Sequence, residues 1–207
     1  MPAVGITDHG NMHGAYEMWS TAVKEGVKPI IGIEAYVTPE TARQDQTRVS
    51  WDTNWNPDID PQHRRRNPND VSGGGLITHL TMWAETDEGL VNLMKASTDA
   101  NLEGRVMRYP RMDKEILAKY SKGIIASSGC PSGIIQTRLL LGQFDEALRA
   151  AGELQDIFGR DNFYIEFMDH GLKIEKQVTD GLLDIAKKLN APLLATNDSH
   201  YVRAEDA

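Results

Sequence analysis

The chain has 207 residues, 40% hydrophobic and 25% charged, so it is long enough to bury a core as one domain or two small ones. Its net charge of −8 argues against binding of duplex DNA through a broadly basic surface. A single cysteine excludes an internal disulfide, and no stretch has the roughly 20 apolar residues of a membrane helix or the organisation of a signal peptide, so we expect a cytoplasmic protein.

Apolar segments rich in Ile, Val and Leu alternate along the chain with segments of helical periodicity. Strands are expected, in chain order, at Ala3–Ile6, Pro29–Val37, Leu76–Trp83, Gly123–Ser127, Phe163–Phe167 and Pro192–Thr196. Helices are expected at Ala15–Glu25, Glu88–Asp99, Phe144–Phe158 and Ile174–Leu189, with Gly26, Gly159 and Asn190 as C-terminal caps. This alternation predicts an α/β fold with parallel strands, either a barrel or a doubly wound sheet.

The segment Thr41–Gly75 interrupts the alternation. It is polar, includes the run Arg64–Arg66 and ends in three glycines. Long polar segments without hydrophobic periodicity are typical of surface loops, and a short arginine run is more typical of solvated surface than of a DNA contact. We therefore expect a flexible insertion at 41–75 within a single domain that covers 1–207.

Side chains that bind metal ions recur at the expected strands. They are Asp8 and His9 after the first strand, Glu34 in the second, His79 in the third, Cys130 after the fourth, Glu166 and His170 around the fifth, and Asp198 and His200 after the sixth. In parallel βα barrels the carboxyl ends of all strands meet at one face, so these residues are expected to meet there. Imidazole and thiolate favour zinc, and bridging carboxylates allow two or three ions close together, as in phosphoester hydrolysis.

Most of these residues also have an ordinary structural explanation when taken singly. His9 is compatible with a helix cap or a solvated loop, and Cys130 alone is more typical of a small buried side chain. Glu34 is harder to explain in this way, because a carboxylate in the apolar run KPIIGIEAYV must be paired or bound to something. The recurrence at several strand ends, more than any one residue, indicates a metal centre. His13 is expected to face solvent.

Three arginines are candidates for phosphate contact. Arg105, Arg108 and Arg111 lie with Tyr109 in EGRVMRYPRMD, which is expected to be a loop after a helix. Guanidinium groups bind phosphate oxygens bidentately, and aromatic rings stack on bases, so we expect these arginines to contact DNA.

Five segments carry a resemblance to a known family: TDHGNMHGA, GVKPIIGIEAYV, IIASSGCPSGIIQ, YIEFMDHGL and LLATNDSHYVRAEDA. They resemble the polymerase and histidinol phosphatase (PHP) domain of bacterial replicative DNA polymerase III alpha subunits, over the whole chain apart from 41–75. The resemblance implies a distorted barrel of seven βα units. It also implies metal ligands at His9, Glu34, His79, Cys130, Asp198 and His200. Glu34 would bridge two ions, with His79, Cys130 and Asp198 serving one of them and His9 and His200 the other.

The same resemblance implies a DNA-directed DNA polymerase in which this domain is a metal-dependent 3′–5′ proofreading exonuclease. Glu34 and Asp198 are the residues expected to act in catalysis, through the ions they bind. Zinc is the expected metal, with manganese and iron as alternatives and up to three ions in a complete domain. The implied partners are the primer 3′ end, the remainder of the alpha subunit, the sliding clamp and other replisome subunits, with no membrane.

The chain departs from the family pattern at both ends. Family members begin with another strand that carries a His-x-His pair, and they continue beyond YVRAEDA into the polymerase body. We therefore expect a fragment without the first strand and with part of the ligand set, which alone has little exonuclease activity. Two alternatives stay open, a non-catalytic scaffold stabilised by metal and, less favoured, a stand-alone PHP phosphatase. Glu166 and His170 are expected either to support the metal ligands or to be structural.

Overall fold

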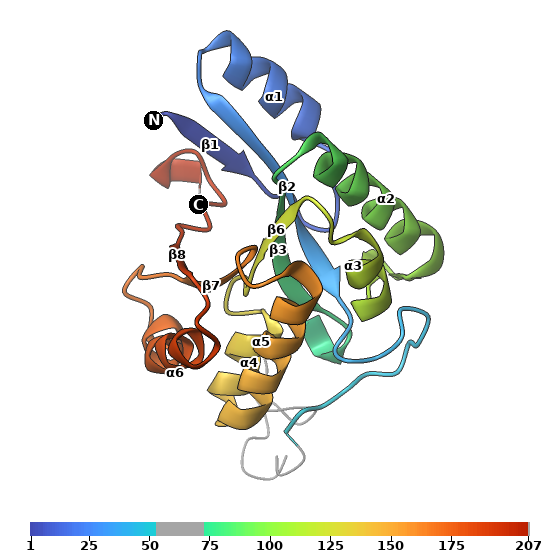
Figure 1. The fold of residues 1–207 in the computed structure, drawn as a ribbon, viewed down its shortest axis with the longest axis vertical. Helices are drawn as coiled ribbons and strands as arrows, with labels where there is room; N and C mark the ends of the chain where they lie inside the picture. Colours follow the sequence, from blue (N-terminus) through green and yellow to red (C-terminus); the bar gives the residue numbers. More distant parts are fainter. Residues whose placement is uncertain (53–72, 207) are drawn as a thin grey trace.

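A computed structural model describes residues 1–52 and 73–206, which form a mixed α/β fold (Figure 1). The strands are β1 (Ala3–Ile6), β2 (Lys28–Val37), β3 (Thr78–Ala84), β4 (Arg105–Val106), β5 (Tyr109–Met112), β6 (Ile124–Ser127), β7 (Phe163–Phe167) and β8 (Leu193–Ala195). The helices are α1 (Ala15–Lys24), α2 (Asp87–Glu103), α3 (Lys114–Tyr120), α4 (Ile134–Leu140), α5 (Phe144–Phe158) and α6 (Lys173–Leu189), with short 3-10 turns at Gly73–Gly75 and Ala204–Asp206. Every strand and helix expected from the sequence is present.

The strands form one sheet in the order β4-β5-β2-β3-β6-β7-β8. The long strand β2 has two neighbours along one edge, because β1 pairs with its first half at Lys28 to Ile31 and β5 with its end at Tyr36 and Val37. Within the described residues β1 pairs only with β2, and β8 pairs only with β7, so the sheet is open. The expected α/β class is therefore confirmed, whereas the described strands do not close into a barrel.

Strand β3 runs antiparallel to both of its neighbours, β2 and β6. The expectation of parallel strands throughout is therefore wrong at this position. Parallel neighbours need a crossover connection, usually a helix, and the described residues between β2 and β3 contain none longer than a 3-10 turn. The consequence for the site is direct, because the start of β3 lies beside the end of β2.

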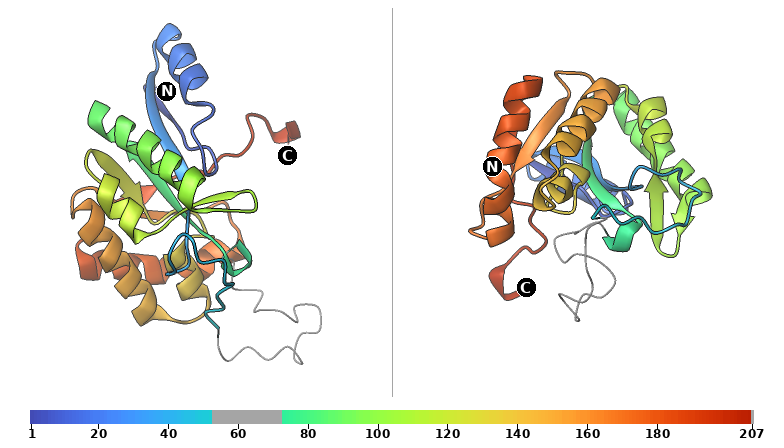
Figure 2. Two further views of the ribbon diagram at one scale, coloured as in Figure 1. Left: turned by 90° about the vertical axis from the view of Figure 1, so that its right-hand side faces the viewer. Right: turned by 90° about the horizontal axis from the view of Figure 1, so that it is seen from below.

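The main core lies between the sheet and the helices that cover it. Successive side chains of a strand point to opposite faces, and Ile33 and Ala35 of β2 pair with Met82 and Leu80 of β3 on the buried face. Helix α2 packs against β2 and β3, α3 against β5, and α5 and α6 against β7, so the helices line the sheet in Figures 1 and 2. The opposite face of the same two strands carries the polar residues described below.

Three pieces of regular structure were not expected. Strands β4 and β5 form a hairpin in which Val106 pairs with Tyr109, where the sequence predicted a loop. Helices α3 and α4 are each seven residues long.

None of the helices in 1–52 and 73–206 combines the length and hydrophobicity that a membrane span requires.

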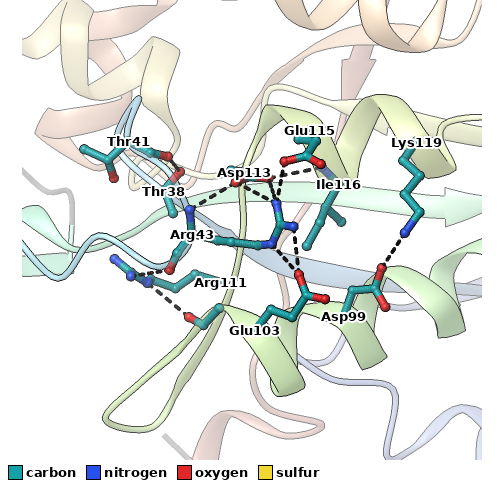
Figure 3. A network of polar contacts seen from close by, with 11 residues as sticks. Thr38, Thr41, Arg43, Asp99, Glu103, Arg111, Asp113, Glu115, Ile116 and Lys119 are labelled. Carbon is teal, nitrogen blue, oxygen red and sulfur yellow. Dashed lines mark hydrogen bonds and ion pairs between the residues drawn. The ribbon is translucent and has the colours of Figure 1, made fainter.

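The chain that follows β2 is held to the body of the fold by arginines (Figure 3). Arg43 contacts Glu103 at 2.7 Å, Asp113 at 3.0 Å and Glu115 at 2.9 Å. The guanidinium of Arg111 donates to the backbone carbonyls of Arg43 and Asp45 at 2.6 and 2.8 Å. The described start of the expected insertion is thus anchored, and its residues 53–72, including Arg64–Arg66, lie outside the described residues.

Candidate metal centre

Glu34 is the centre of a cluster of metal-binding side chains. It lies in β2 and is 4% exposed. Its Oε1 is 2.5 Å from Nδ1 of His79 and 3.5 Å from Sγ of Cys130, whereas its Oε2 is 3.1 Å from Nδ1 of His9. The two oxygens of one buried carboxylate therefore face two different sets of donors.

His9 is fixed by an extension of the pairing between β1 and β2. The backbone N–H of Glu34 donates to the Asp8 carbonyl at 3.1 Å, and the N–H of Gly10 donates to the Glu34 carbonyl at 2.8 Å. Gly10 has φ of +64°, and a Cβ there would lie 2.5 Å from the Tyr36 ring, so glycine is required for this close approach. The Asp8 carboxylate accepts a hydrogen bond from Gly14 N–H at 2.7 Å, at the start of α1, and only His9 of the pair joins the cluster.

His79 and Cys130 reach Glu34 from the other side. His79 is the second residue of β3, and the antiparallel direction of that strand brings it beside the end of β2. Its backbone N–H donates to the Ser132 carbonyl at 3.0 Å, which ties it to the loop between β6 and α4. Cys130 lies in this loop, is 9% exposed, and has its Sγ 3.4 Å from Nδ1 of His79.

The segment after β8 completes the cluster. Nε2 of His200 is 3.3 Å from Nε2 of His9, and Nδ1 of His200 is 2.8 Å from the Asp198 carbonyl oxygen. Asp198 has φ of +41°, and its Oδ1 is 4.0 Å from Nδ1 of His200. Direct contacts therefore join His9, Glu34, His79, Cys130 and His200, and Asp198 lies beside His200.

The electrostatics of the cluster are those of a site for a cation. Burial alone would raise the pKa of Glu34, but the hydrogen bond and charge of His79, together with the charge of His9, hold that pKa below its usual value. Burial and the charge of Glu34 raise the pKa of the Cys130 thiol far above its usual value. Burial and the charge of Glu34 also raise the pKa of Asp198. A bound cation would reverse both increases, because it stabilises carboxylate and thiolate.

The separations between donor atoms fit a tetrahedral divalent ion. Zinc bonds of about 2.0 to 2.3 Å place neighbouring ligand atoms roughly 3.3 to 3.7 Å apart. Cys130 Sγ lies 3.4 Å from His79 Nδ1 and 3.5 Å from Glu34 Oε1, and the facing nitrogens of His9 and His200 are 3.3 Å apart. The 2.5 Å contact between Glu34 and His79 is shorter, as in a charge-assisted hydrogen bond. The donor set therefore suits one ion held by Glu34, His79 and Cys130, while His9 presents Nδ1 to the other oxygen of Glu34 and Nε2 to His200.

An aromatic and basic surface adjoins the centre. Tyr36 follows Glu34 by two residues on the same strand face. Its ring is stacked on the His9 ring at 6.2 Å and tilted against the His79 ring at 5.5 Å, between centroids. Tyr109 lies edge-on to Tyr36 at 5.1 Å, and the Arg108 guanidinium lies 5.2 Å from the Tyr109 ring. Tyr36 was not among the residues expected at the site, although its two-residue spacing from Glu34 is the signal that places both on one face.

Only two of the three arginines expected to contact phosphate have exposed side chains. Arg105 and Arg108 are exposed, on the hairpin of β4 and β5. Arg111 is fully buried, and its guanidinium donates to four backbone carbonyls, those of Gly104, Leu76, Arg43 and Asp45. This burial is incompatible with the expected phosphate contact, so Arg111 is structural. His13 is exposed, as expected.

Glu166 and His170 lie outside the set of contacting donors. Glu166 is 3% exposed in β7 and accepts hydrogen bonds from the hydroxyls of Ser127 and Thr196. His170 has its Nδ1 2.6 Å from Oε1 of Glu175, whose Oε2 accepts the backbone N–H of His170 at 2.8 Å. His170 thereby fixes the entry into α6.

The family model of the PHP domain matches residues 1–170. The chain belongs to the PHP family. This PHP chain is 52% identical over 207 residues to the DNA polymerase III subunit alpha of Mycobacterium tuberculosis (strain CDC 1551 / Oshkosh), a match that covers 100% of the chain and 17% of that protein. It is 53% identical over 207 residues to that of Saccharopolyspora erythraea, with 100% and 17% covered, and 39% identical over 206 residues to that of Thermus aquaticus, with 100% and 15% covered. The PHP chain thus spans 15–17% of the length of these curated relatives.

Proposed function

We propose that this PHP domain binds divalent metal ions, zinc by its donor chemistry, and hydrolyses phosphodiester bonds as the 3′–5′ proofreading exonuclease of a DNA polymerase III alpha subunit. The observation that carries the proposal is the orientation of Glu34. One oxygen faces His79 and Cys130 and the other faces His9, as a carboxylate that bridges two ions requires. The similarity to polymerase alpha subunits along the whole chain supports the assignment to DNA.

Each group of donors has a distinct role in this proposal. Oε1 of Glu34 would hold one ion with His79 and Cys130, and we assign Asp198 to the same ion. Oε2 would hold a second ion with Nδ1 of His9, and His200 lies at the opposite nitrogen of that ring, Nε2. When bound, such ions supply Lewis-acid stabilisation of charge on a phosphate oxygen and lower the pKa of water. Glu34 and Asp198 are the catalytic carboxylates, since they would fix the positions of the ions relative to the substrate.

The proposed substrate is the 3′ end of a primer strand. Tyr109 packs edge-on against Tyr36, which borders the centre, and the Arg108 guanidinium lies over the Tyr109 ring. Arg105 is exposed on the same hairpin. With a net charge of −8, the chain must attract a phosphate backbone through such local groups and through the ions. The proposed partners are the remainder of the alpha subunit and, through it, the sliding clamp and other replisome subunits in the cytoplasm.

We also propose that the open sheet corresponds to the distorted (βα)7 barrel of the PHP type. The contact between His9 and His200 supports this, because His9 follows β1 and His200 follows β8. Among the described residues, β1 pairs only with β2 and β8 only with β7. Their ends therefore approach each other at the metal centre, and one further strand between them would close the barrel.

The neighbouring histidines of the TDHGNMH motif provide a matched test. His9→Ala and Cys130→Ala remove proposed ligands, whereas His13→Ala removes an exposed imidazole four residues away. We expect the first two to lower zinc affinity by more than about 100-fold, beyond the effect typical of residues that only support a ligand, and to abolish removal of a mismatched 3′ nucleotide by the polymerase subunit that carries this domain. His13→Ala should leave both unchanged. Wild-type zinc content and mismatch removal in His9→Ala would contradict the proposal.

One observation favours a second function, that of a metal-stabilised scaffold. The ligands come from the ends of β1 and β8, from β2 and β3, and from the loop after β6, so ions at the centre would cross-link five segments of an open sheet. A chelator would then lower the melting temperature of a protein that removes no nucleotide. Loss of mismatch removal on chelation, with activity restored by zinc, would instead select the exonuclease.

A further inference from the structure

The carboxylate of Glu166 is enclosed by hydroxyl groups from two neighbouring strands. Its Oε2 accepts a hydrogen bond from Ser127, the last residue of β6, and its Oε1 accepts one from Thr196, the first residue after β8. Glu166 itself lies in the strand between them, and it is 3% exposed. Both oxygens therefore accept a hydrogen bond from a flanking segment, so Glu166 connects β6 to the chain after β8.

On the β6 side, the same connection sets the path of the chain toward Cys130. The Ser128 hydroxyl accepts hydrogen bonds from Glu166 N–H at 2.9 Å and from the Gln136 amide at 3.1 Å. The Gln136 amide also donates to the Gly129 carbonyl at 2.6 Å. Every residue from Ser127 to Gly129 is thus tied to β7 or α4 immediately before Cys130.

On the β8 side, the connection sets the path toward Asp198 and His200. The Thr196 N–H donates to the Phe167 carbonyl at 3.3 Å, beyond the last paired residue of β8, while the Thr196 hydroxyl holds Glu166. Asp198 follows two residues later in a left-handed backbone conformation, with φ of +41°. The contact between Thr196 and Glu166 therefore holds the chain two residues before Asp198.

We propose that Glu166 is a positioning residue for the metal centre, which sets the Cys130 loop against the segment of Asp198 and His200 by holding Ser127 and Thr196 together. This inference rests on the proposed metal-binding function. Ligands from separate loops bind an ion tightly only when the groups behind them fix their orientation.

The energetics favour a single arrangement of this connector. Burial raises the pKa of Glu166, and the charges of Asp198 and Glu34 raise it further, while the two hydroxyls counteract them. A buried carboxylate that loses a hydrogen-bond donor bears the cost of that unsatisfied oxygen, so the two hydroxyls and the carboxylate hold one another in place. Glutamine can satisfy the same pair, since its oxygen accepts from one hydroxyl and its amide donates to the other.

Cobalt(II) provides the probe, because its ligand-field and thiolate charge-transfer bands report coordination by Cys130 without any measurement of activity. We expect Glu166→Ala and Thr196→Val to weaken cobalt(II) binding by about 10- to 100-fold and to reduce the thiolate band, the range typical of residues behind metal ligands. Glu166→Gln should stay within a few-fold of wild type. Thr98→Val, which removes a hydroxyl that donates to the Met94 carbonyl in α2, is the control and should leave the spectrum unchanged.

The outcomes separate this inference from the function on which it rests. Wild-type cobalt affinity and spectrum in both Glu166→Ala and Thr196→Val, with only a lower melting temperature, would overturn the positioning role and leave the metal centre intact. A wild-type protein that binds cobalt(II) without a thiolate band, or does not bind it, would overturn the metal centre and the positioning role together. Thr196→Val changes a half-buried side chain without altering its shape, so its result decides the question if Glu166→Ala fails to fold.

Discussion

Replacement of Arg43 by alanine tests what holds the chain after β2 to the body of the protein (Figure 3). The Arg43 side chain is 12% exposed and contacts three carboxylates, those of Glu103, Asp113 and Glu115. We expect Arg43→Ala to lower the free energy of unfolding by about 3 kcal/mol, most of it from the pair with Asp113.

The burial of each carboxylate sets its share of that loss. The Asp113 side chain is 10% exposed and would lose both bonds from the guanidinium, yet it keeps the backbone N–H donors of Arg43 and Ile116. Its share is therefore about 2 kcal/mol, below the roughly 3 to 5 kcal/mol for a buried charge left with no partner. Glu103 and Glu115 are 50% and 75% exposed, and each pair with them contributes about 0 to 1 kcal/mol.

Urea unfolding of Arg43→Ala, alone and combined with Asp113→Asn or Glu115→Gln, measures these shares as double-mutant cycles. The expected coupling energy is about 2 kcal/mol with Asp113 and below about 1 kcal/mol with Glu115, and the melting temperature should fall by roughly 6 to 12 °C. A total loss below about 1 kcal/mol, or a stronger coupling to Glu115 than to Asp113, would refute the assignment of this energy to burial.

Two further predictions concern stability. A Cβ on Gly89 would lie 1.7 Å from the Gly123 carbonyl oxygen, so Gly89→Ala should lower the free energy of unfolding by about 2 kcal/mol or more. The nearest contact of a Cβ on Gly152 in α5 is 3.9 Å away, so Gly152→Ala should raise that free energy by about 0.5 to 1 kcal/mol. Urea midpoints of the two variants that move in the same direction would contradict this. Burial would raise the pKa of Glu40, but hydrogen bonds from Arg149 and Arg138 bring it below its ordinary value of 4.5. The contribution of ionised Glu40 to the free energy of unfolding is thus complete above about pH 4.5 and is lost as the pH falls through the lower pKa of the folded state. Glu40→Gln should therefore make the stability fall less steeply on acidification. An unchanged pH dependence would count against this role.

The strands and longer helices were predictable because their hydrophobic periodicity reflects burial directly. Ile33, Ala35 and Val37 alternate with Glu34 and Tyr36 along β2, and the structure places the two sets on opposite faces. Helix α4 gave no such signal, because Ile134 to Arg138 are all buried and the usual contrast between an apolar and a polar side is missing. The direction of β3 was equally hidden, since periodicity is the same for parallel and antiparallel strands.

The candidate site was also only partly predictable from the sequence. The residue types at His9, Glu34, His79 and Cys130 indicated a cluster, and the structure brings their donor atoms together even though β3 runs opposite to the expected direction. Arg111 was misread, because arginine is almost always exposed unless its charge and donors are matched. Its partners are backbone carbonyls of Leu76, Gly104 and the chain after β2. Contacts with backbone groups far away in the chain cannot be recognised from the types of neighbouring residues.

The contact between His9 and His200 joins residues 191 positions apart, nearly the full length of the chain. During synthesis His9, Glu34, His79 and Cys130 emerge first, so Glu34 can meet His79 and Cys130 well before His200 leaves the ribosome. Bringing His9 and His200 together also costs conformational entropy of the intervening chain, and this entropy is lost before the contact itself stabilises the fold. The donors around Glu34 therefore become available in the growing chain before His200, which follows β8.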